Sequence, residues 1–210
     1  MGVLDGVATE INRLKRRVRR LELVESASEF VEGSISPSGM SLIESIRTDT
    51  ASGSVVFSDI SQSYKHLVLY SHAKTTNATE RQESFWQAND DTGSNYDTLS
   101  LRFSGDGASS NSVSRATTSA ILGRIPGATA CDNAYAEIET VWQNYSSSGI
   151  WKASHSAPTV IFGNLGNDTD VQLSIAGGQW RSGSAVSSME LFPSSGNWAA
   201  SCVFDLYGVI

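Results

Sequence analysis

The residue types that most often perform chemistry are few and scattered in this chain. His66, His72 and His155 are its three histidines. His66 and His72 fall on one predicted strand and on one of its faces, but roughly 20 Å apart at ~3.3 Å per residue. That strand alone therefore cannot bring both rings to one metal ion. The sequence also has no HExxH, GxSxG, Walker or Rossmann signature. We expect no catalytic residues, no metal site and no cofactor.

Carboxylates and tryptophans offer weaker candidates. Asp90 with Asp91, or Asp168 with Asp170, could supply ligands for Ca²⁺ in a loop, but aspartate is common in turns because it caps its own backbone. A glycosidase needs two carboxylates flanking a sugar cleft, and pairs are inevitable among 22 acidic residues. An exposed tryptophan could stack on a sugar, yet the five tryptophans of a β domain serve first as core and interface residues.

The clearest spacing in the chain lies in residues 4–22, where apolar residues recur at alternating intervals of three and four. This is a heptad pattern, with Leu4, Ile11 and Val18 at a and Val7, Leu14 and Leu21 at d. In a parallel assembly Glu10 would face Lys15 and Arg17 would face Glu22 of the neighbouring chain, both pairs of opposite sign. The pattern predicts an oligomerising coiled coil over residues 1–28.

The number of chains in that coiled coil is less directly encoded. Branched residues at a with leucine at d favour dimers, whereas Arg17-Val18-Arg19-Arg20-Leu21-Glu22 resembles a short trimerisation motif in which Arg17 covers the seam and pairs with Glu22. We favour the trimer. Two alternatives are an amphipathic helix packed on its own domain and a basic arm for nucleic acid or membrane. The narrow apolar stripe without aromatic residues disfavours the basic arm. The oligomerisation residues are Leu4, Val7, Ile11, Leu14, Arg17, Val18, Leu21 and Glu22.

Composition limits the partners of the remaining chain. The formal net charge is −7, yet six of the 15 basic residues lie between Arg13 and Arg20, so the rest is strongly acidic. We therefore expect no nucleic-acid partner. No apolar run approaches the ~18 residues of a membrane span, and the N-terminus lacks a signal-peptide pattern, so we expect no membrane insertion. Cys131 and Cys202 lack metal spacing; a disulfide between them is one alternative, and we favour two buried free thiols.

After a linker over residues 29–39, the hydrophobic period changes from 3.5 to 2. Short candidate strands separated by polar turns predict an antiparallel, jelly-roll-like β-sandwich over residues 40–210. The candidate strands are Ser41–Ile46, Ser54–Ile60, His66–His72, Ser84–Ala88, Thr98–Phe103, Thr117–Leu122, Ala136–Trp142, Thr159–Phe162, Asp170–Ile175, Ser187–Phe192 and Ser201–Tyr207. The predicted fold class is thus mainly β with a short N-terminal coiled-coil helix.

Alternation along the strands predicts which side chains face the core. Leu99, Leu101 and Phe103 share one face, and Val171, Leu173 and Ile175 form another inward row. Ala136, Ile138 and Thr140 oppose Tyr135, Glu137 and Glu139, which predicts one wet face. Leu67-Val68-Leu69-Tyr70 is apolar on both faces, and this indicates a central strand covered on its second side.

Three short motifs carry a resemblance to a known family. Phe57, Ile60, Tyr64, His66, Leu67 and Leu69 fit F-x-x-I-x-x-x-Y-x-H-L-x-L; residues 89–96 (Asn-Asp-Asp-Thr-Gly-Ser-Asn-Tyr) are similar to N-x-D-T-G-x-N-Y; and residues 206–210 end the chain as Leu-Tyr-Gly-Val-Ile. In this order they resemble a group of tailed-bacteriophage virion structural proteins with β domains. The resemblance implies architectural roles: Phe57, Ile60, Leu67 and Leu69 in the core, Asp90 to Asn95 in a tight turn, and Tyr207 with Leu206 in a strand that closes the core.

With this resemblance we expect a trimeric fibre-type module on the surface of a bacteriophage virion. The expected function is that of a tail fibre or tip protein in host adsorption, with no enzymatic activity. Its partners would be two further copies of the chain, other virion proteins and a host surface glycan. The alternative is a capsid decoration or head-fibre protein, and the remote alternative is a polysaccharide-degrading tail enzyme.

Overall fold

The computed structural model describes residues 39–162 and 171–210, and every regular element in these ranges is a β-strand. They form two antiparallel sheets. The larger contains β1 (Met40–Arg47), β3 (His66–Ala73), β5 (Tyr96–Ser104), β6 (Ser109–Thr117), β8 (Ala136–Gln143), β9 (Lys152–Ser156), β10 (Thr159–Ile161), β11 (Val171–Trp180) and β13 (Val203–Val209). The smaller contains β2 (Val55–Phe57), β4 (Arg81–Ala88), β7 (Ala120–Pro126) and β12 (Met189–Pro193).

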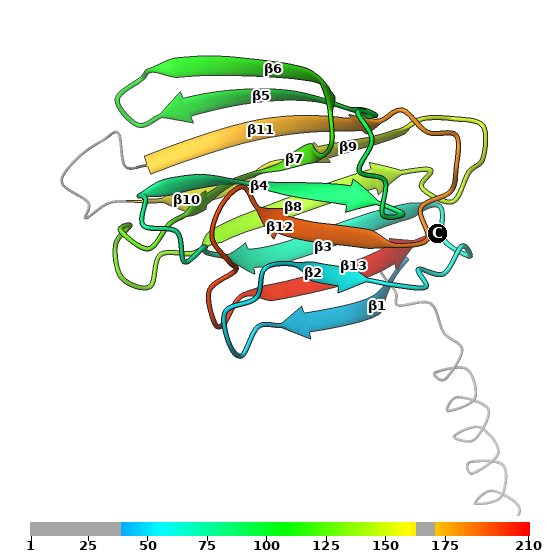
Figure 1. Ribbon diagram of the computed structural model, residues 1–210, viewed down its shortest axis with the longest axis horizontal. Helices are drawn as coiled ribbons and strands as arrows, with labels where there is room; N and C mark the ends of the chain where they lie inside the picture. The colour runs from blue at the N-terminus through cyan, green and yellow to red at the C-terminus, as the bar shows by residue number, and fades with distance from the viewer. Residues whose placement is uncertain (1–38, 163–170) are drawn as a thin grey trace, which may run out of the picture. The chain divides into compact units, whose positions relative to one another are not determined.

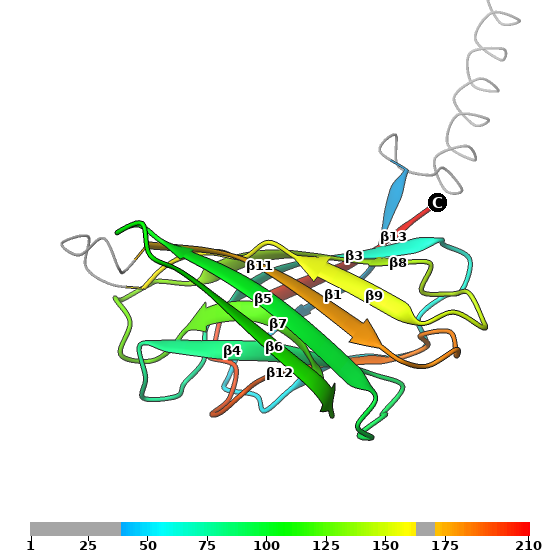
Figure 2. The same ribbon diagram turned by 90° about the horizontal axis from the view of Figure 1, so that it is seen from above.

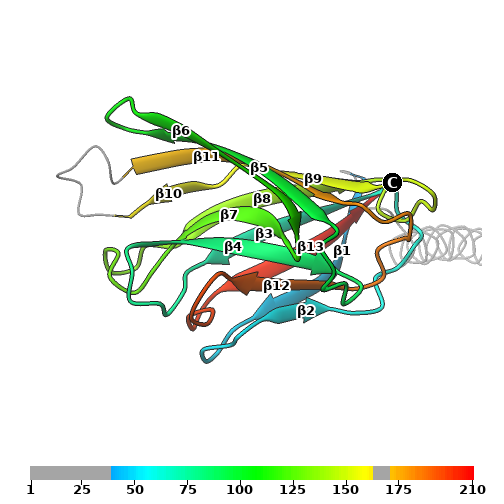
Figure 3. The ribbon, with the colours of Figure 1, turned by 45° about the horizontal axis from the view of Figure 1, so that its top comes forward.

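The larger sheet has the order β1-β13-β3-β8-β10-β11-β5-β6, and β9 pairs with both β8 and β11 (Figure 1). The smaller sheet has the order β2-β12-β4-β7 and forms the second layer (Figure 2). β6 is an edge strand, and its hairpin with β5 projects past the smaller sheet (Figure 3). β6 therefore lacks a covering layer, which explains why its side chains from Ser109 to Ala116 are exposed on both faces.

The core lies between the two sheets and is built around aromatic side chains. The Trp86 ring meets Trp142 and Tyr96 edge to face, with centroids 5.5 and 5.8 Å apart, a geometry that aromatic quadrupoles favour. Phe57, Ile60, Leu67 and Leu69 are all buried. The core roles that the motif resemblance implies for these four residues agree with the structure.

Other expectations are also confirmed. The predicted antiparallel β-sandwich is observed, and β3 is a central strand between β13 and β8. The expected cover on the second face of β3 is confirmed only in part, because Val68 is buried there whereas Tyr70 is exposed. In β8, Ala136, Ile138 and Thr140 are buried and Glu137 is exposed, so one face of this strand is indeed wet.

Several expectations were wrong. β6 and β9 were not predicted, because Ser-Ser-Asn-Ser-Val-Ser and Lys-Ala-Ser-His-Ser have the composition of loops. The rows Leu99, Leu101, Phe103 and Val171, Leu173, Ile175 face outward. Tyr207 also lies on the outer face, against Tyr70, and only Leu206 is buried in the core. Cys202 is buried but Cys131 is half-buried, so the expectation of two buried thiols holds for Cys202 alone.

Candidate functional site

The outward-facing apolar rows form the most unusual surface of the domain. Leu99 lies opposite Val113 of β6, Leu101 opposite Ile175, and Phe103 opposite Leu173, so the side chains are neighbours across three strands. All are between 37% and 62% exposed. We call this surface the apolar face, and it consists of Leu99, Leu101, Phe103, Val113, Val171, Leu173 and Ile175.

The inner face of the same strands is small and polar. Ser100, Gln172 and Ser174 are buried there, as are Lys152 and Ser154 of β9. An alternating strand has two faces, and a shift of one residue exchanges them. Here the polar face is the inner one, which inverts the usual pattern of a half-exposed sheet.

The two layers approach each other closely at one point of this region. A Cβ atom on Gly178 would lie 2.8 Å from Ala120 Cβ and 3.1 Å from Trp86 Nε1, so the sheets approach closely at β11. Some of the buried polar groups are paired: the Thr140 and Ser156 hydroxyls lie 2.9 Å apart, and Arg124 donates to Gln172 at 3.1 Å. Within the described residues, the buried Ser100 hydroxyl has no hydrogen-bond partner. The polar side chains of these strands thus lie between the sheets, and their leucine and phenylalanine side chains face outward.

A hollow of about 710 Å³ lies beside the apolar face. One aromatic side chain lines this hollow, the indole of Trp151, which is 56% exposed at the start of β9. Gly177 of β11 lacks a side chain between His155 and Leu99, which leaves space on the outer surface. We call this site the Trp151 hollow; its lining comprises Asp97, Thr98, Leu99, Val113, Ser114, Arg115, Trp151, Ala153, Ser154, Gly177, Gly178 and Gln179.

The polar lining of the Trp151 hollow is held in place by the neighbouring turn. Asp97 accepts a hydrogen bond from the Ala116 backbone N–H at 2.9 Å and lies 3.5 Å from the Arg181 guanidinium. Arg181 also donates to the Ser94 carbonyl at 2.6 Å. The hollow thus combines one projecting aromatic ring with carboxylate, amide and guanidinium groups.

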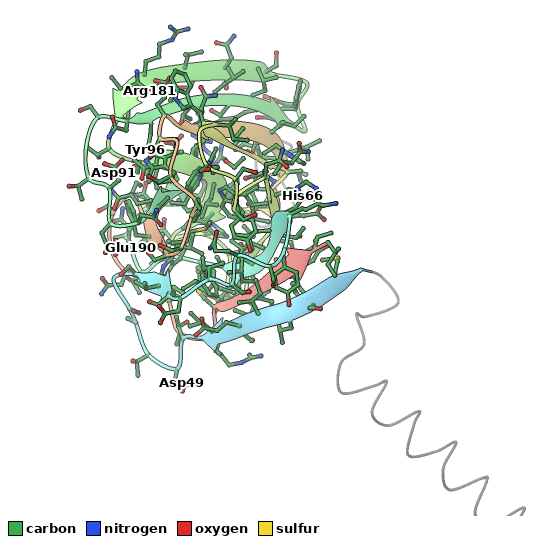
Figure 4. All side chains as sticks on the ribbon, turned by 90° about the vertical axis from the view of Figure 1, so that its right-hand side faces the viewer. Asp49, His66, Asp91, Tyr96, Arg181 and Glu190 are labelled. Carbon is green, nitrogen blue, oxygen red and sulfur yellow. The ribbon has the colours of Figure 1, made fainter. Side chains whose placement is uncertain are left out.

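The motif of residues 89–96 forms a tight turn, as the resemblance implies. Asp91 accepts hydrogen bonds from Trp180 Nε1 at 2.7 Å and from the Gly93 N–H at 2.9 Å. The bond from Trp180 is the main reason that the pKa of Asp91 is held below its ordinary value. At the end of the turn, the buried Tyr96 hydroxyl accepts from the Ala88 N–H, and burial raises its pKa to about 12. Figure 4 labels Asp91, Tyr96 and Arg181, which lie in the upper left of that view.

The first and last motifs meet in the folded chain. The ring of Tyr64 packs directly over Gly208 of β13, where a Cβ atom would overlap it. Glycine is needed at this position because any side chain would displace the ring. These motif residues therefore have a structural role.

The histidines are not brought together. The His72 imidazole hydrogen-bonds Glu137 and stacks on Tyr135, with ring centroids 4.4 Å apart. His66 Nδ1 accepts from the Asn144 N–H at 3.2 Å. The part of the chain that the structure describes has no cluster of three or more side chains suited to a metal ion. Within the same ranges, no helix is long and apolar enough to cross a membrane.

The predicted oligomerisation residues lie outside the described residues, as do Asp168 and Asp170. Sequence reasoning named no binding residues and missed the Trp151 hollow. The signal was present in the alternation of residues 151–156, where Trp, Ala and His occupy one face and Lys, Ser and Ser the other. Composition alone assigns tryptophans to the core, and four of the five are indeed buried.

Comparison with known proteins does not assign a family. No protein-family model matches the chain, and no curated protein matches it. Among solved structures, an exo-inulinase from Aspergillus awamori is 12% identical with a TM-score of 0.26; the match covers 80% of this chain, which spans 29% of the inulinase. The galectin LEC-6 from Caenorhabditis elegans is 9% identical with a TM-score of 0.29, over 84% of this chain and 99% of the galectin. At such scores these similarities carry no argument about function.

Proposed function

We propose that the chain is a structural protein of a bacteriophage virion, a trimeric fibre-type module whose jelly-roll-like domain takes part in host adsorption at the tail fibre or tip. The heptad pattern of residues 4–22 and the three motifs support this proposal at the level of sequence. The Trp151 hollow carries the adsorption role. It offers an exposed indole beside polar groups, the combination that holds the apolar face of a sugar ring and its hydroxyls.

Trimeric presentation makes a shallow site sufficient for this role. A single indole contributes contacts worth about 0.5–1.5 kcal/mol beyond the area that it buries. Three linked sites multiply such weak contacts, provided that the host surface presents repeated ligands. The proposed ligand is therefore a repetitive polar polymer such as a bacterial surface glycan.

A capsid decoration protein is the second candidate. The cluster of basic residues from Arg13 to Arg20 favours it, because this segment could dock on an acidic capsid surface. Gold-labelled antibodies against the chain, applied to intact particles of the phage that encodes it, distinguish the two. Label at the tail supports adsorption, label over the head supports decoration, and particles without label refute a virion role.

Competition for host cells tests the Trp151 hollow. Purified protein should block phage adsorption, and Trp151→Ala should weaken this block by tenfold or more, since a loss of ~1.4 kcal/mol is tenfold at each site and linked sites compound it. Leu42→Ala is the matched control, since Leu42 is equally exposed on the edge strand β1. Equal blocking by both variants would remove the Trp151 hollow from adsorption.

A further inference from the structure

The apolar face is a large hydrophobic patch for a domain that stands alone in water. From their exposed fractions, its seven side chains present on the order of 600 Å² of surface, the upper end for the largest patch on a monomer. Two such faces in contact would remove roughly 1,200 Å² from water, which reaches the size of a specific interface. A surface of this size and composition calls for a covering partner.

The lack of charge on the apolar face allows a second copy of the same chain to be that partner. The chain carries a formal charge of −7, so copies repel one another through most of their surface. The apolar face itself has no ionisable side chain, and Arg102 of β5 pairs with Glu83 of β4 in the other layer. Copies can therefore approach face to face without burying an unpaired charge.

The edge strand beside the apolar face lacks the usual protection against pairing. Exposed edges are commonly guarded by lysine, proline or inward-pointing charges. β6 contains serine, asparagine, valine, alanine and threonine with Arg115 as its single charge, and it is exposed on both faces. An edge of this kind is compatible with coverage by a neighbouring copy.

We infer that copies of this chain pack against one another through their apolar faces, so that the β domains share a common hydrophobic contact. The inference deepens the proposed function and rests on it for the trimeric state. The predicted coiled coil would raise the effective concentration of neighbouring domains to about the millimolar range, which lets a modest interface stay closed. Leu99 and Val113 belong to both surfaces, so Trp151 would lie beside the subunit contact.

Photo-crosslinking in the full chain tests this inference directly. The crosslinker p-benzoylphenylalanine is placed at Leu173 in one protein and at Val56 in another. Val56 is the matched control because it is 46% exposed on β2 of the smaller sheet, outside the apolar face. Irradiation should yield covalently joined chains from position 173 and single chains from position 56. Single chains from both, or the same yield of joined chains from both, would overturn the inference.

A charge placed in the contact gives a second readout. The test uses a chain in which Leu14→Asp and Val18→Asp disrupt the predicted coiled-coil seam, so that self-association depends on the β domains. In this chain, Leu173→Glu should weaken self-association roughly tenfold or more, since an unpaired charge would be buried. Val56→Glu should leave self-association unchanged. Sedimentation velocity measures both. Equal association of the two variants contradicts the inference.

The outcomes separate this inference from the proposed function. A trimer of intact chains that gives no cross-link at position 173 refutes the apolar contact and leaves the virion module standing. Cross-linking at position 173 in a protein that antibodies do not find on particles supports the contact and refutes the virion role.

Discussion

Asp91 fixes the turn between β4 and β5, and its replacement by asparagine gives the sharpest test of how that turn is held. The carboxylate accepts from Trp180 Nε1 at 2.7 Å, from the Gly93 N–H at 2.9 Å and from Asn95 Nδ2 at 2.9 Å. An asparagine side chain in its place has one acceptor oxygen and one NH₂ group. In either orientation the NH₂ group would face a donor, so at least one hydrogen bond would be lost.

The size of the effect follows from burial. Trp180 is almost fully buried, and a buried donor without an acceptor costs about 1–3 kcal/mol. We therefore expect Asp91→Asn to lower the free energy of unfolding by about 2 kcal/mol, or the melting temperature by roughly 4–8 °C. Asp90→Asn is the matched control. It removes the same charge from an exposed neighbour that has a positive φ of 54°.

The same bonds predict a pH dependence. The pKa of Asp91 is lower in the folded chain than the ordinary 3.8. At pH values between these two pKa values the unfolded chain binds more protons, so stability falls as the pH falls. The advantage of the wild type over Asp91→Asn should be full above about pH 5 and should shrink below about pH 3.8 through the folded-state pKa. Urea unfolding followed by tryptophan fluorescence measures it. Equal midpoints for Asp91→Asn and Asp90→Asn, or a gap that persists in acid, would refute the reasoning.

Two further predictions concern stability. Gly208→Ala should lower the free energy of unfolding by about 1–3 kcal/mol, because the added methyl group displaces the Tyr64 ring. Gly177→Ala should lower it less, because the new Cβ would have no neighbour closer than 3.9 Å. Equal losses of stability for the two variants in calorimetry would contradict this. Lys152→Met should stabilise the domain by on the order of 1 kcal/mol at about pH 7, because burial lowers the pKa of this lysine and, among the residues that the structure describes, its ammonium group donates to the Ile150 carbonyl alone. Between the lowered folded-state pKa and 10.5 the unfolded chain binds more protons, so the gain should be full below this range and should shrink as the pH rises through it. A gain that is independent of pH would argue against the buried charge as its cause.

Local sequence patterns predicted strands wherever one face of the strand is apolar and the other polar. β8 and β13 follow this rule, and their inward residues Ile138 and Leu206 are buried. β6 and β9 escaped prediction because they contain mostly small polar residues. They pair as strands because adjacent strands offer backbone donors and acceptors, and no side-chain pattern reports that pairing.

The sequence by itself determined the all-β character of the described residues 40–162 and 171–210, the positions of most strands and the tight turn at Asp91. These properties depend on neighbours along the chain. Only the tertiary structure decided which face of β5, β9 and β11 is buried, because alternation separates two faces without saying which one meets the other sheet. The serine face of these strands packs against the other sheet, which approaches closely at Gly178, and Leu101, Leu173 and Trp151 lie on the outside.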